Sequence, residues 1–494
     1  MRALLVHPDF PATFWSFRYA LPFVGKKAAL PPLGLLTVAS LLPEGWEPRL
    51  VDTNVRALAG EDLAWADYLF VGGMAVQRAS ARRIVERARS AGVPVVAGGP
   101  LFSSGNSVED FPGVDHFVLG EAEASLPAFL RDLERGRAQR VYRPTGFPDV
   151  TRSPVPRWEL ADLDAYHSLS VQFSRGCPYD CEFCNVTALF GRAPRVKTAE
   201  QVIRELDALH GLGWRGRIFF ADDNLIGHRR RFENELLPAL IEWQRTHGGM
   251  TFFTQASINL ADEPRLVERM VRAGFDTVFV GIETPDEESL SEANKKHNQG
   301  RDLIDDVKRL QRAGLQVQGG FIVGFDSDEP SIFQRQIDFI QKSGIVTAMV
   351  GLLQAPAGTR LFERLKREGR LLGRISGDNT DGTTNIVPKM DPETLRRGYR
   401  RILRRIYSPE SFYRRVRTFL SEYRLPDTRR PLTLERVGAF VRSVYRLGIR
   451  GRERRHFWSL LLATLVRRPR LLPTAVTLAI SGYHLRKVSE THIL

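Results

Sequence analysis

The three cysteines of this 494-residue chain lie within eight residues, at positions 177, 181 and 184. The spacing C-x3-C-x2-C gathers soft thiolates, which are the ligands that iron–sulfur clusters use. A cubane cluster has four irons, so Cys177, Cys181 and Cys184 would leave one iron open to a further ligand. Structural zinc usually needs four ligands, commonly as two separated pairs, and the chain has no second pair. Zinc binding and three ordinary buried thiols are the alternatives. An odd cysteine count in a long chain excludes a disulfide framework, and a thiol-ligated cluster indicates a reducing cytoplasm.

The elements that must hold this loop follow from the hydropathy pattern. An apolar run at 169–173 predicts a strand directly before the cysteines, and Gly176 relieves steric limits where the backbone curls. Five further strand-like runs alternate with helical patterns, such as those over 199–212 and 263–273, which is typical of βα units. Six such units predict a partial (β/α)6 barrel over residues 165–385. The five further runs cover residues 217–220, 251–253, 277–280, 318–323 and 348–353.

A set of residues follows these predicted strands at their carboxyl ends, where barrel folds place their chemistry. An Asp-Asp-Asn run by itself is more often a helix cap or a turn, so the interpretation depends on the whole set. The set comprises Asp222, Asp223, Asn224, Gln255, Ser257, Glu283, Ile322 and Gly324.

The segment from Cys177 to Cys184, with Phe183 before the last cysteine, resembles the cluster loop of radical S-adenosylmethionine (SAM) enzymes. The resemblance implies a [4Fe-4S] cluster on the three cysteines, whose open iron binds the methionyl amine and carboxylate of SAM. One electron from the cluster then cleaves SAM to a 5′-deoxyadenosyl radical. It also implies that Asp222 or Asp223 receives the methionyl ammonium, although Ala221-Asp222-Asp223 replaces the family's usual Gly-Gly-Glu. The other implied SAM contacts are Ser257 and Glu283 at the ribose or amine, Ile322 and Gly324 beside the adenine, and Phe183, Asn224 and Gln255.

Residues 1–140 carry a second α/β pattern, with five strand-like runs and a helix predicted over 79–91. This pattern predicts a doubly wound, Rossmann-like sheet of the flavodoxin type. Several strands end in glycines, which let a flat or phosphate-bearing ligand approach the backbone. No G-x-G-x-x-G run supports a dinucleotide site. The predicted strands cover residues 3–6, 49–51, 68–71, 93–96 and 116–119.

Placed before a radical SAM loop, this pattern resembles the cobalamin-binding domain of a large class of radical enzymes. The resemblance implies that cobalamin binds here, and the lack of an Asp-x-His-x-x-Gly run implies that no protein histidine ligates the cobalt. The alternative is a Rossmann-like domain that binds nothing. The aromatic segment 11–17 would cover the corrin, or belong to the core. The implied cobalamin contacts are Trp15, Gly72, Gly73, Met74, Gly98, Gly99, Gly120 and Glu121.

A proline-rich stretch over 141–164 predicts a linker between these two domains, and residues 386–494 form a last, basic segment. Residues 393–494 hold 24 Lys/Arg and seven Asp/Glu, a balance of +17, whereas the whole chain carries +14. Arginines and apolar residues recur on helical spacing, which predicts an α-helical C-terminal domain.

The apolar runs of this segment, 456–466 and 471–480, fall short of the roughly 18 residues that a membrane span needs. A basic amphipathic surface with Trp and Leu suits an anionic membrane. Nucleic acid is disfavoured, because aliphatic runs rather than stacking aromatics lie between the charges. A helical cap on the barrel with a solvated basic face is the alternative. The expected location is cytoplasmic, with peripheral contact at the inner face of the cell membrane.

Over nearly its whole length the sequence resembles the hopanoid C-2 methylase group, most clearly at 31–35, 174–184, 281–285 and 377–382. The resemblance implies a C-methyltransferase acting on an unactivated carbon of a lipid or polyisoprenoid substrate. In such enzymes the adenosyl radical removes a hydrogen, methylcobalamin delivers the methyl group, and a second SAM remethylates the cobalamin. An external electron donor, flavodoxin or ferredoxin, is implied as well.

Parts of the pattern also suggest three other functions. A radical SAM enzyme with both cofactors can form a ring or a carbon–carbon bond without methyl transfer. An inactive, membrane-associated cofactor-binding module is disfavoured by the intact cysteine triad. Radical tRNA modification by methylthio transfer needs a second cluster, and RNA methylation through a methylcysteine needs a further cysteine. Both are disfavoured, because the chain has no cysteine beyond the three of the loop.

Overall fold

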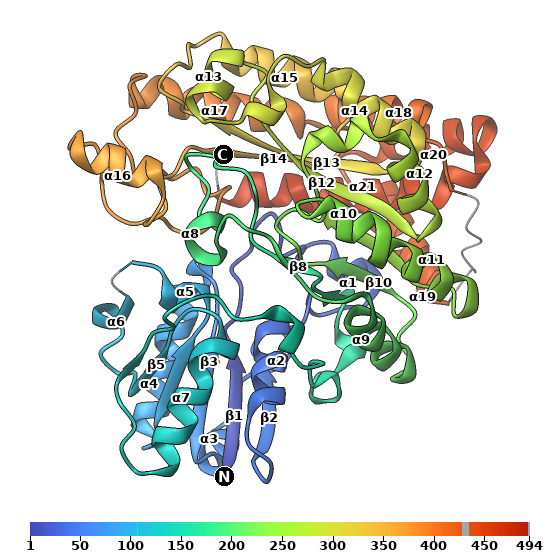
Figure 1. Ribbon diagram of the computed structural model, residues 1–494. Coiled ribbons are helices and arrows are strands. Elements are labelled where there is room, and N and C mark those ends of the chain that lie inside the picture. Colours follow the sequence, from blue (N-terminus) through green and yellow to red (C-terminus); the bar gives the residue numbers. More distant parts are fainter. Residues whose placement is uncertain (106, 427–433, 493–494) are drawn as a thin grey trace.

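The computed structural model describes residues 1–105, 107–426 and 434–492, and contains two six-stranded parallel sheets with a helical C-terminal region (Figure 1). The first sheet has the order β2-β1-β3-β4-β5-β6, which extends the flavodoxin-type order by one strand. Its strands are β1 (Arg2–His7), β2 (Glu47–Asp52), β3 (Tyr68–Gly72), β4 (Val95–Gly98), β5 (His116–Val118) and β6 (Val141–Tyr142).

Alternate residues of the first sheet pack on its two faces, as a doubly wound sheet requires. Leu4 and Val6 lie in one core with α3 (Gly60–Trp65) and α4 (Arg78–Ser90). Ala3 and Leu5 lie in the opposite core with α2 (Leu33–Leu41) and α7 (Ala122–Glu134). The predicted doubly wound fold is therefore confirmed. The two-residue strand β6 was not predicted, because two residues are too few to show an alternating pattern.

The second sheet has the order β14-β13-β12-β11-β10-β7, which confirms the partial (β/α)6 barrel. Because Ile218, Phe220 and Val278 pack into the core against the surrounding helices, the alternate residues of the same strands face the inside of the barrel. The strands are β7 (Ser168–Val171), β10 (Arg217–Phe220), β11 (Thr251–Gln255), β12 (Phe275–Glu283), β13 (Gln316–Val323) and β14 (Ala348–Leu352). The main outer helices are α9 (Ala199–Gly211), α11 (Leu237–Thr246), α12 (Pro264–Arg272), α14 (Leu303–Ala313) and α15 (Ile332–Ser343).

The C-terminal region is helical, as the arginine spacing predicts, and its first two helices support the barrel. In α17 (Pro392–Ile406) the apolar residues are buried and the arginines are exposed. The Tyr399 hydroxyl donates to the Val350 carbonyl at 3.1 Å, and the buried Arg415 guanidinium donates to the Val346 carbonyl at 3.2 Å. The other elements are α18 (Pro409–Glu422), α19 (Leu434–Ser443), η8 (Val444–Ile449), α20 (Arg454–Arg467) and α21 (Leu472–His492). No described helix is long and apolar enough to cross a bilayer.

Candidate active site

The cysteine loop is held by a short antiparallel hairpin, β8 (Ser174–Arg175) with β9 (Arg195–Val196). Gly176 follows β8 with a φ of 95°, which favours glycine. A Cβ atom at Gly176 would lie 2.9 Å from the Gly191 carbonyl oxygen, so any side chain there would force the loop open. The Cys177 amide donates to the same oxygen at 3.3 Å. The sequence therefore closes the loop tightly around the cysteines.

The donor chemistry of the three cysteines fits an iron–sulfur cluster. All three thiols are free and partly buried, and burial raises the pKa of Cys184 to about 12, so a thiolate there needs positive charge beside it. Within the described ranges no group of three or more His, Cys, Asp or Glu side chains converges on one metal ion. A cubane does not require such convergence, because each thiolate binds a different iron. Cys177, Cys181 and Cys184 would hold three irons and leave the fourth for SAM.

The two neighbouring aspartates after β10 have different surroundings. Asp222 is fully buried and accepts hydrogen bonds from the Phe173 amide at 3.1 Å and from the Ser174 amide and hydroxyl at 2.5 Å each. Burial raises the pKa of Asp222 to about 7. Asp223 accepts from the Gly176 amide at 3.3 Å and lies near Cys177, and burial raises its pKa to about 6. Asp222 therefore shapes the hairpin, whereas Asp223 is the carboxylate placed beside the cluster loop.

The other predicted SAM residues lie along the same barrel edge. Asn224 and Ser257 bond each other across two strands, with the Asn224 amide donating to the Ser257 hydroxyl at 3.2 Å. Gln255 is the last, half-buried residue of β11. The Gly324 amide, at a φ of 105°, donates to Asp328. Ile322 and Phe183 pack against one apolar cluster that includes Phe325. The structure thus brings the set together at one edge, while its role toward SAM stays a prediction.

Lys295 is a residue that the sequence reasoning missed. Its ammonium lies 2.6 Å from Glu283, and both side chains are buried. Burial by itself lowers the pKa of Lys295, but Glu283 and the thiols of Cys181 and Cys184 raise it above its ordinary value. Glu283 has a positive φ of 64°, a strained conformation for a glutamate. A permanent cation therefore lies beside the cysteines, and only the buried placement of Lys295 distinguishes it from the exposed lysines.

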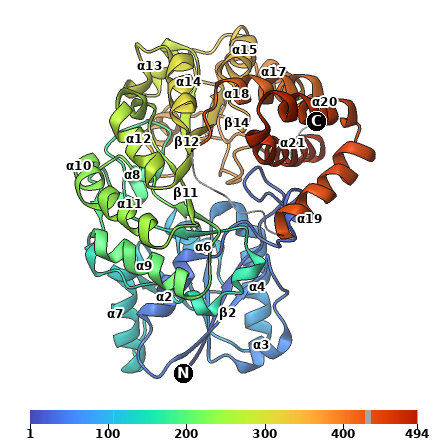
Figure 2. The same cartoon turned by 90° about the vertical axis from the view of Figure 1, so that its right-hand side faces the viewer.

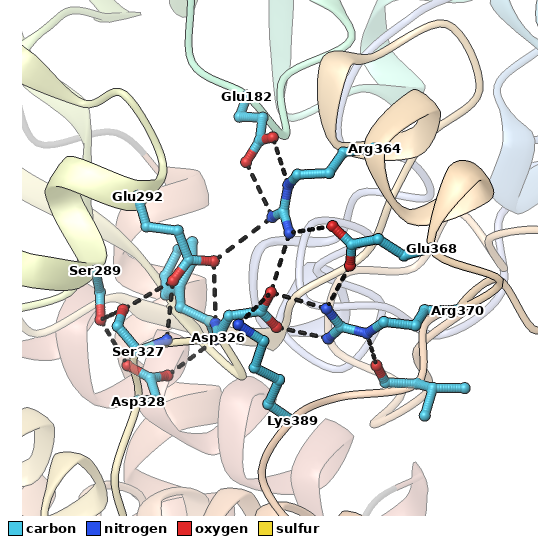
Figure 3. Close-up of polar contacts among 12 residues, drawn as sticks. Glu182, Ser289, Glu292, Asp326, Ser327, Asp328, Arg364, Glu368, Arg370 and Lys389 are labelled. Carbon is cyan, nitrogen blue, oxygen red and sulfur yellow. Dashed lines mark hydrogen bonds and ion pairs between the residues drawn. The ribbon is translucent and has the colours of Figure 1, made fainter.

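A network of ion pairs fixes the outer side of the cysteine loop (Figure 3). The Arg364 guanidinium, on α16 (Arg360–Arg367), contacts Glu182 at 2.8 Å and Asp326 at 3.0 Å. Arg370 contacts the other oxygen of Asp326 at 2.6 Å. Burial by itself would raise the pKa of Asp326, but the two arginines have the larger effect and lower it to about 2. Since Glu182 stands between Cys181 and Cys184, this network ties the loop to the end of β13.

Glu121, which was expected to contact cobalamin, lies in a buried cluster between the two sheets. Its carboxylate contacts Arg175 and Arg195 at 2.6 Å each, and Arg175 also contacts Glu123 at 2.7 Å. Burial raises the pKa of Glu123, but Arg175 lowers it more, to about 2. Because Arg175 precedes Gly176 and the first cysteine, these pairs join the first domain directly to the cluster loop.

The carboxyl edge of the first sheet faces the barrel and carries the predicted glycines (Figure 1). A Cβ atom at Gly98 would lie 2.8 Å from the Val118 carbonyl, and one at Gly99 would lie 3.6 Å from the Gly73 backbone. Gly98 therefore lets β4 approach the end of β5 more closely than a residue with a side chain would. Residues without side chains at this edge fit a flat macrocycle, and their role toward cobalamin stays a prediction. Met74 is 54% exposed beside this edge. The chain carries no histidine between the end of β1 and residue 115, and that no histidine ligates cobalt remains a prediction. The other predicted glycines, Gly72 and Gly120, end β3 and follow β5.

Trp15 extends from the first domain into the second. Its ring centroid lies 5.2 Å from that of Phe279 on β12, and its indole nitrogen lies 3.2 Å from the Met349 sulfur on β14. Both partners occupy inward-facing positions of their strands, as do the stacked rings of Phe219 and Phe253, 4.9 Å apart. The inner face of the barrel therefore carries an aromatic cluster, bordered by Arg217, whose guanidinium lies 4.5 Å from the centroid of the Phe253 ring. The domain expected to hold cobalamin contacts this cluster through Trp15.

Comparisons with known proteins agree with this architecture. Residues 27–130 match the B12 binding domain, residues 171–340 match the radical SAM superfamily, and residues 359–493 match a domain of unknown function, DUF4070. The fold is similar to that of a radical SAM methyltransferase, TsrM, from Kitasatospora setae, solved with cobalamin and a [4Fe-4S] cluster. The TM-score is 0.64 at 17% identity, over 99% of each chain.

Two relatives are similar over most of their length. The chain is 40% identical to an uncharacterized methyltransferase of Synechocystis, covering 99% of this chain and 92% of that protein. It is 36% identical to the hopanoid C-2 methylase of Rhodopseudomonas palustris, covering 94% of this chain and 90% of that protein. With a B12 binding domain, a radical SAM domain and these relatives, the chain uses a [4Fe-4S] cluster, SAM and cobalamin. It belongs to the family of cobalamin-dependent radical SAM methyltransferases that includes the hopanoid C-2 methylase.

Proposed function

We propose that the protein transfers a methyl group to an unactivated carbon of a lipid or polyisoprenoid substrate of the hopanoid type. The observation that carries this proposal is an apolar cluster on the inner face of the barrel, where Phe219, Phe253, Phe279 and Met349 face inward and Trp15 joins them. A hydrocarbon skeleton would bury its surface against these side chains at about 25 cal/mol per Å2. The 36% identity to a hopanoid C-2 methylase supports the same substrate class.

The cluster with SAM would supply the radical that removes the hydrogen atom, and cobalamin would supply the methyl group. The residues of the chain would do the positioning. The three cysteines would hold the cluster, and Asp223 would bind the methionyl ammonium as a charge-assisted partner. Asn224, Gln255, Ser257, Ile322 and Gly324 would border SAM, and the glycine edge of the first sheet would hold cobalamin. Trp15 would exclude water from the space between the carboxyl edge of the first sheet and the carboxyl edge of the barrel.

The proposal fixes a product balance. Each methylation consumes two SAM and two electrons, and yields methylated lipid, 5′-deoxyadenosine, methionine and S-adenosylhomocysteine in equal amounts. The test is an anaerobic assay of the cluster- and cobalamin-loaded protein with a hopanoid, combined with lipid profiling of cells with and without it. Product without S-adenosylhomocysteine would instead indicate ring or carbon–carbon bond formation. An unchanged methylated-lipid profile in the cells would overturn the lipid-methylase proposal.

We further propose that the electrons come from a small acidic carrier of the flavodoxin or ferredoxin type. A hollow of about 360 Å3 lies over Glu182, and its charged lining consists of three arginines and two glutamates: Arg360, Arg364, Arg367, Glu182 and Glu363. The Arg360 side chain is 54% exposed, and Glu182 lies between Cys181 and Cys184 in the sequence. An acidic carrier on this basic surface would come close to the cluster, and raised salt should slow the reduction.

We also propose that the protein works in the reducing cytoplasm, at the inner face of the cell membrane. A lipid substrate and a C-terminal region rich in arginine support this location.

A further inference from the structure

Two helical segments near the C-terminus expose apolar side chains on one face each. Along α19 and η8, the residues at intervals of three or four are strongly exposed, with Leu434 at 92%, Val441 at 60% and Ile449 at 57%. Val437 and Tyr445 fill the same spacing, each 47% exposed. This spacing places all five side chains on one side of the helix. In a water-soluble surface helix that side would normally be polar or covered.

A second exposed stripe lies on α20. Leu462 is 59% exposed, Leu465 53% and Val466 82%, one to two turns after Trp458 at 40%. The two stripes meet at Trp458, whose indole nitrogen donates to the Gly448 carbonyl at 3.0 Å, next to Ile449. Other residues of the run 456–466, including Phe457, Leu460 and Leu461, are buried in the core. Figure 2 shows α19, α20 and α21 together on one side of the molecule.

The surface formed by these stripes, which we call the α19–α20 face, is surrounded by arginines. Between positions 434 and 470 the sequence holds ten arginines and two acidic residues, Glu435 and Glu453. Glu435 lies 3.8 Å from Lys26. Glu453 is buried and paired with Arg486, so its charge is already neutralised. Arg446, Arg450, Arg454 and others are exposed around the place where the stripes meet. Long arginine side chains can lie along an apolar surface and extend their charges to phosphate groups.

The α19–α20 face is also connected to the barrel. Helix α19 packs against α1 (Leu21–Val24), and the Arg442 guanidinium donates to the Phe23 carbonyl at 2.6 Å. The segment that leads into α1 carries Trp15, which contacts Phe279 and Met349 inside the barrel. The N-terminal segment therefore connects the exposed face to the inner face of the barrel.

We infer that the α19–α20 face docks on an anionic lipid bilayer, with the exposed apolar side chains in the interface and the arginines on the lipid phosphates. This inference rests on the proposed function for its purpose, since a membrane-bound protein takes a lipid substrate directly from the bilayer. The arginines would also attract a nucleic acid, but a nucleic acid would leave the exposed Leu, Val and Ile side chains without an apolar partner. An anionic membrane offers phosphate groups to the arginines and an apolar region to the exposed side chains.

The test is flotation of the full, cluster-loaded chain with vesicles of phosphatidylcholine, with and without phosphatidylglycerol. The wild type should bind only the anionic vesicles, and more weakly at high salt. The double variant Val441→Asp/Leu462→Asp should bind about tenfold more weakly or worse, because two charges would enter the interface. Leu212→Asp is the matched control, because Leu212 is 47% exposed on the barrel, away from this face. Circular dichroism and iron content should be equal in all three proteins.

Two outcomes would overturn the inference. One is vesicle binding by the double variant equal to that of Leu212→Asp. The other is wild-type binding to RNA but not to anionic vesicles. A further comparison separates the inference from the proposed function: the double variant should methylate a hopanoid in detergent micelles but lose activity with the same hopanoid in vesicles. If no methylation occurs in either form while flotation behaves as expected, the proposed function fails and the docking surface stands.

Discussion

Glu123→Gln should destabilise the protein strongly, although it changes only one oxygen for an amide nitrogen. Arg175 contacts the Glu123 carboxylate at 2.7 Å, and the glutamate side chain is only 8% exposed. The pKa of Glu123 falls from 4.5 to about 2 in the folded protein. Since each unit of pKa shift corresponds to about 1.4 kcal/mol, the ionised form contributes ~3 kcal/mol at neutral pH. The amide cannot replace that charge beside a buried guanidinium.

The pH dependence follows from the same shift. A carboxyl whose folded pKa is depressed contributes its full stability above the unfolded value of 4.5, and that contribution is lost as the pH falls toward about 2. The assay is urea unfolding of wild type and variant, with the unfolding midpoint and slope compared at pH 7 and at steps below 4.5. The difference between the two proteins should be largest at neutral pH and should narrow across this window.

The matched control is Glu159→Gln. Glu159 pairs with Arg157 on the surface, where the two side chains are 49% and 43% exposed. The same chemical change there should cost no more than about 1 kcal/mol. Two results would contradict this prediction: equally small losses of stability in Glu123→Gln and Glu159→Gln, or a Glu123→Gln difference that does not narrow below pH 4.5. Either would show that the buried pair of Glu123 with Arg175 does not stabilise the contact between the domains.

The remaining predictions concern the cluster site. Asp223→Asn should keep its iron but weaken SAM binding by about tenfold or more, because a charge-assisted contact is lost. Asp222→Asn should lose iron on purification, because both carboxylate oxygens accept hydrogen bonds from the hairpin and the amide would replace one of them with a donor. Iron analysis and SAM titration by electron paramagnetic resonance separate the two, and equal effects would contradict the assignment. Lys295→Met should make cluster reduction harder, since a buried cation beside the thiolates favours the added electron, and an unchanged midpoint in a redox titration would count against it. Arg364→Leu should speed loss of the cluster on dilution by releasing Glu182, with the exposed Arg367→Leu as its control, and equal loss from both variants would be the contrary result.

The sequence by itself determined the elements of this protein and the chemistry at one loop. Strand and helix positions follow from local periodicity, which needs no knowledge of distant residues. The alternating apolar runs therefore predicted both parallel sheets, and the arginine spacing predicted the C-terminal helices. The cysteine spacing is equally local, because three thiolates in eight residues are close in any fold. Residues after successive parallel strands also meet at one edge by topology alone, which is why most of the predicted SAM set lies together.

Only the tertiary structure decided which of these residues point at the site and which support it. Asp222 and Asp223 are neighbours with the same chemistry, and their roles separate only because Ser174 is folded against one of them. The sequence predicts Glu121 at the edge of the first sheet, but in the folded protein it forms a buried ion pair with Arg175. Trp15 contacts Met349 across 334 positions, and Lys295 reaches the cysteines from another unit of the barrel. Such pairings depend on how whole elements pack. A hydropathy pattern shows which side of a helix or strand is buried, but not which other element packs against that side. The same reason explains why the sequence indicated a basic, apolar C-terminal region, while the folded protein decided which of its apolar residues remain exposed.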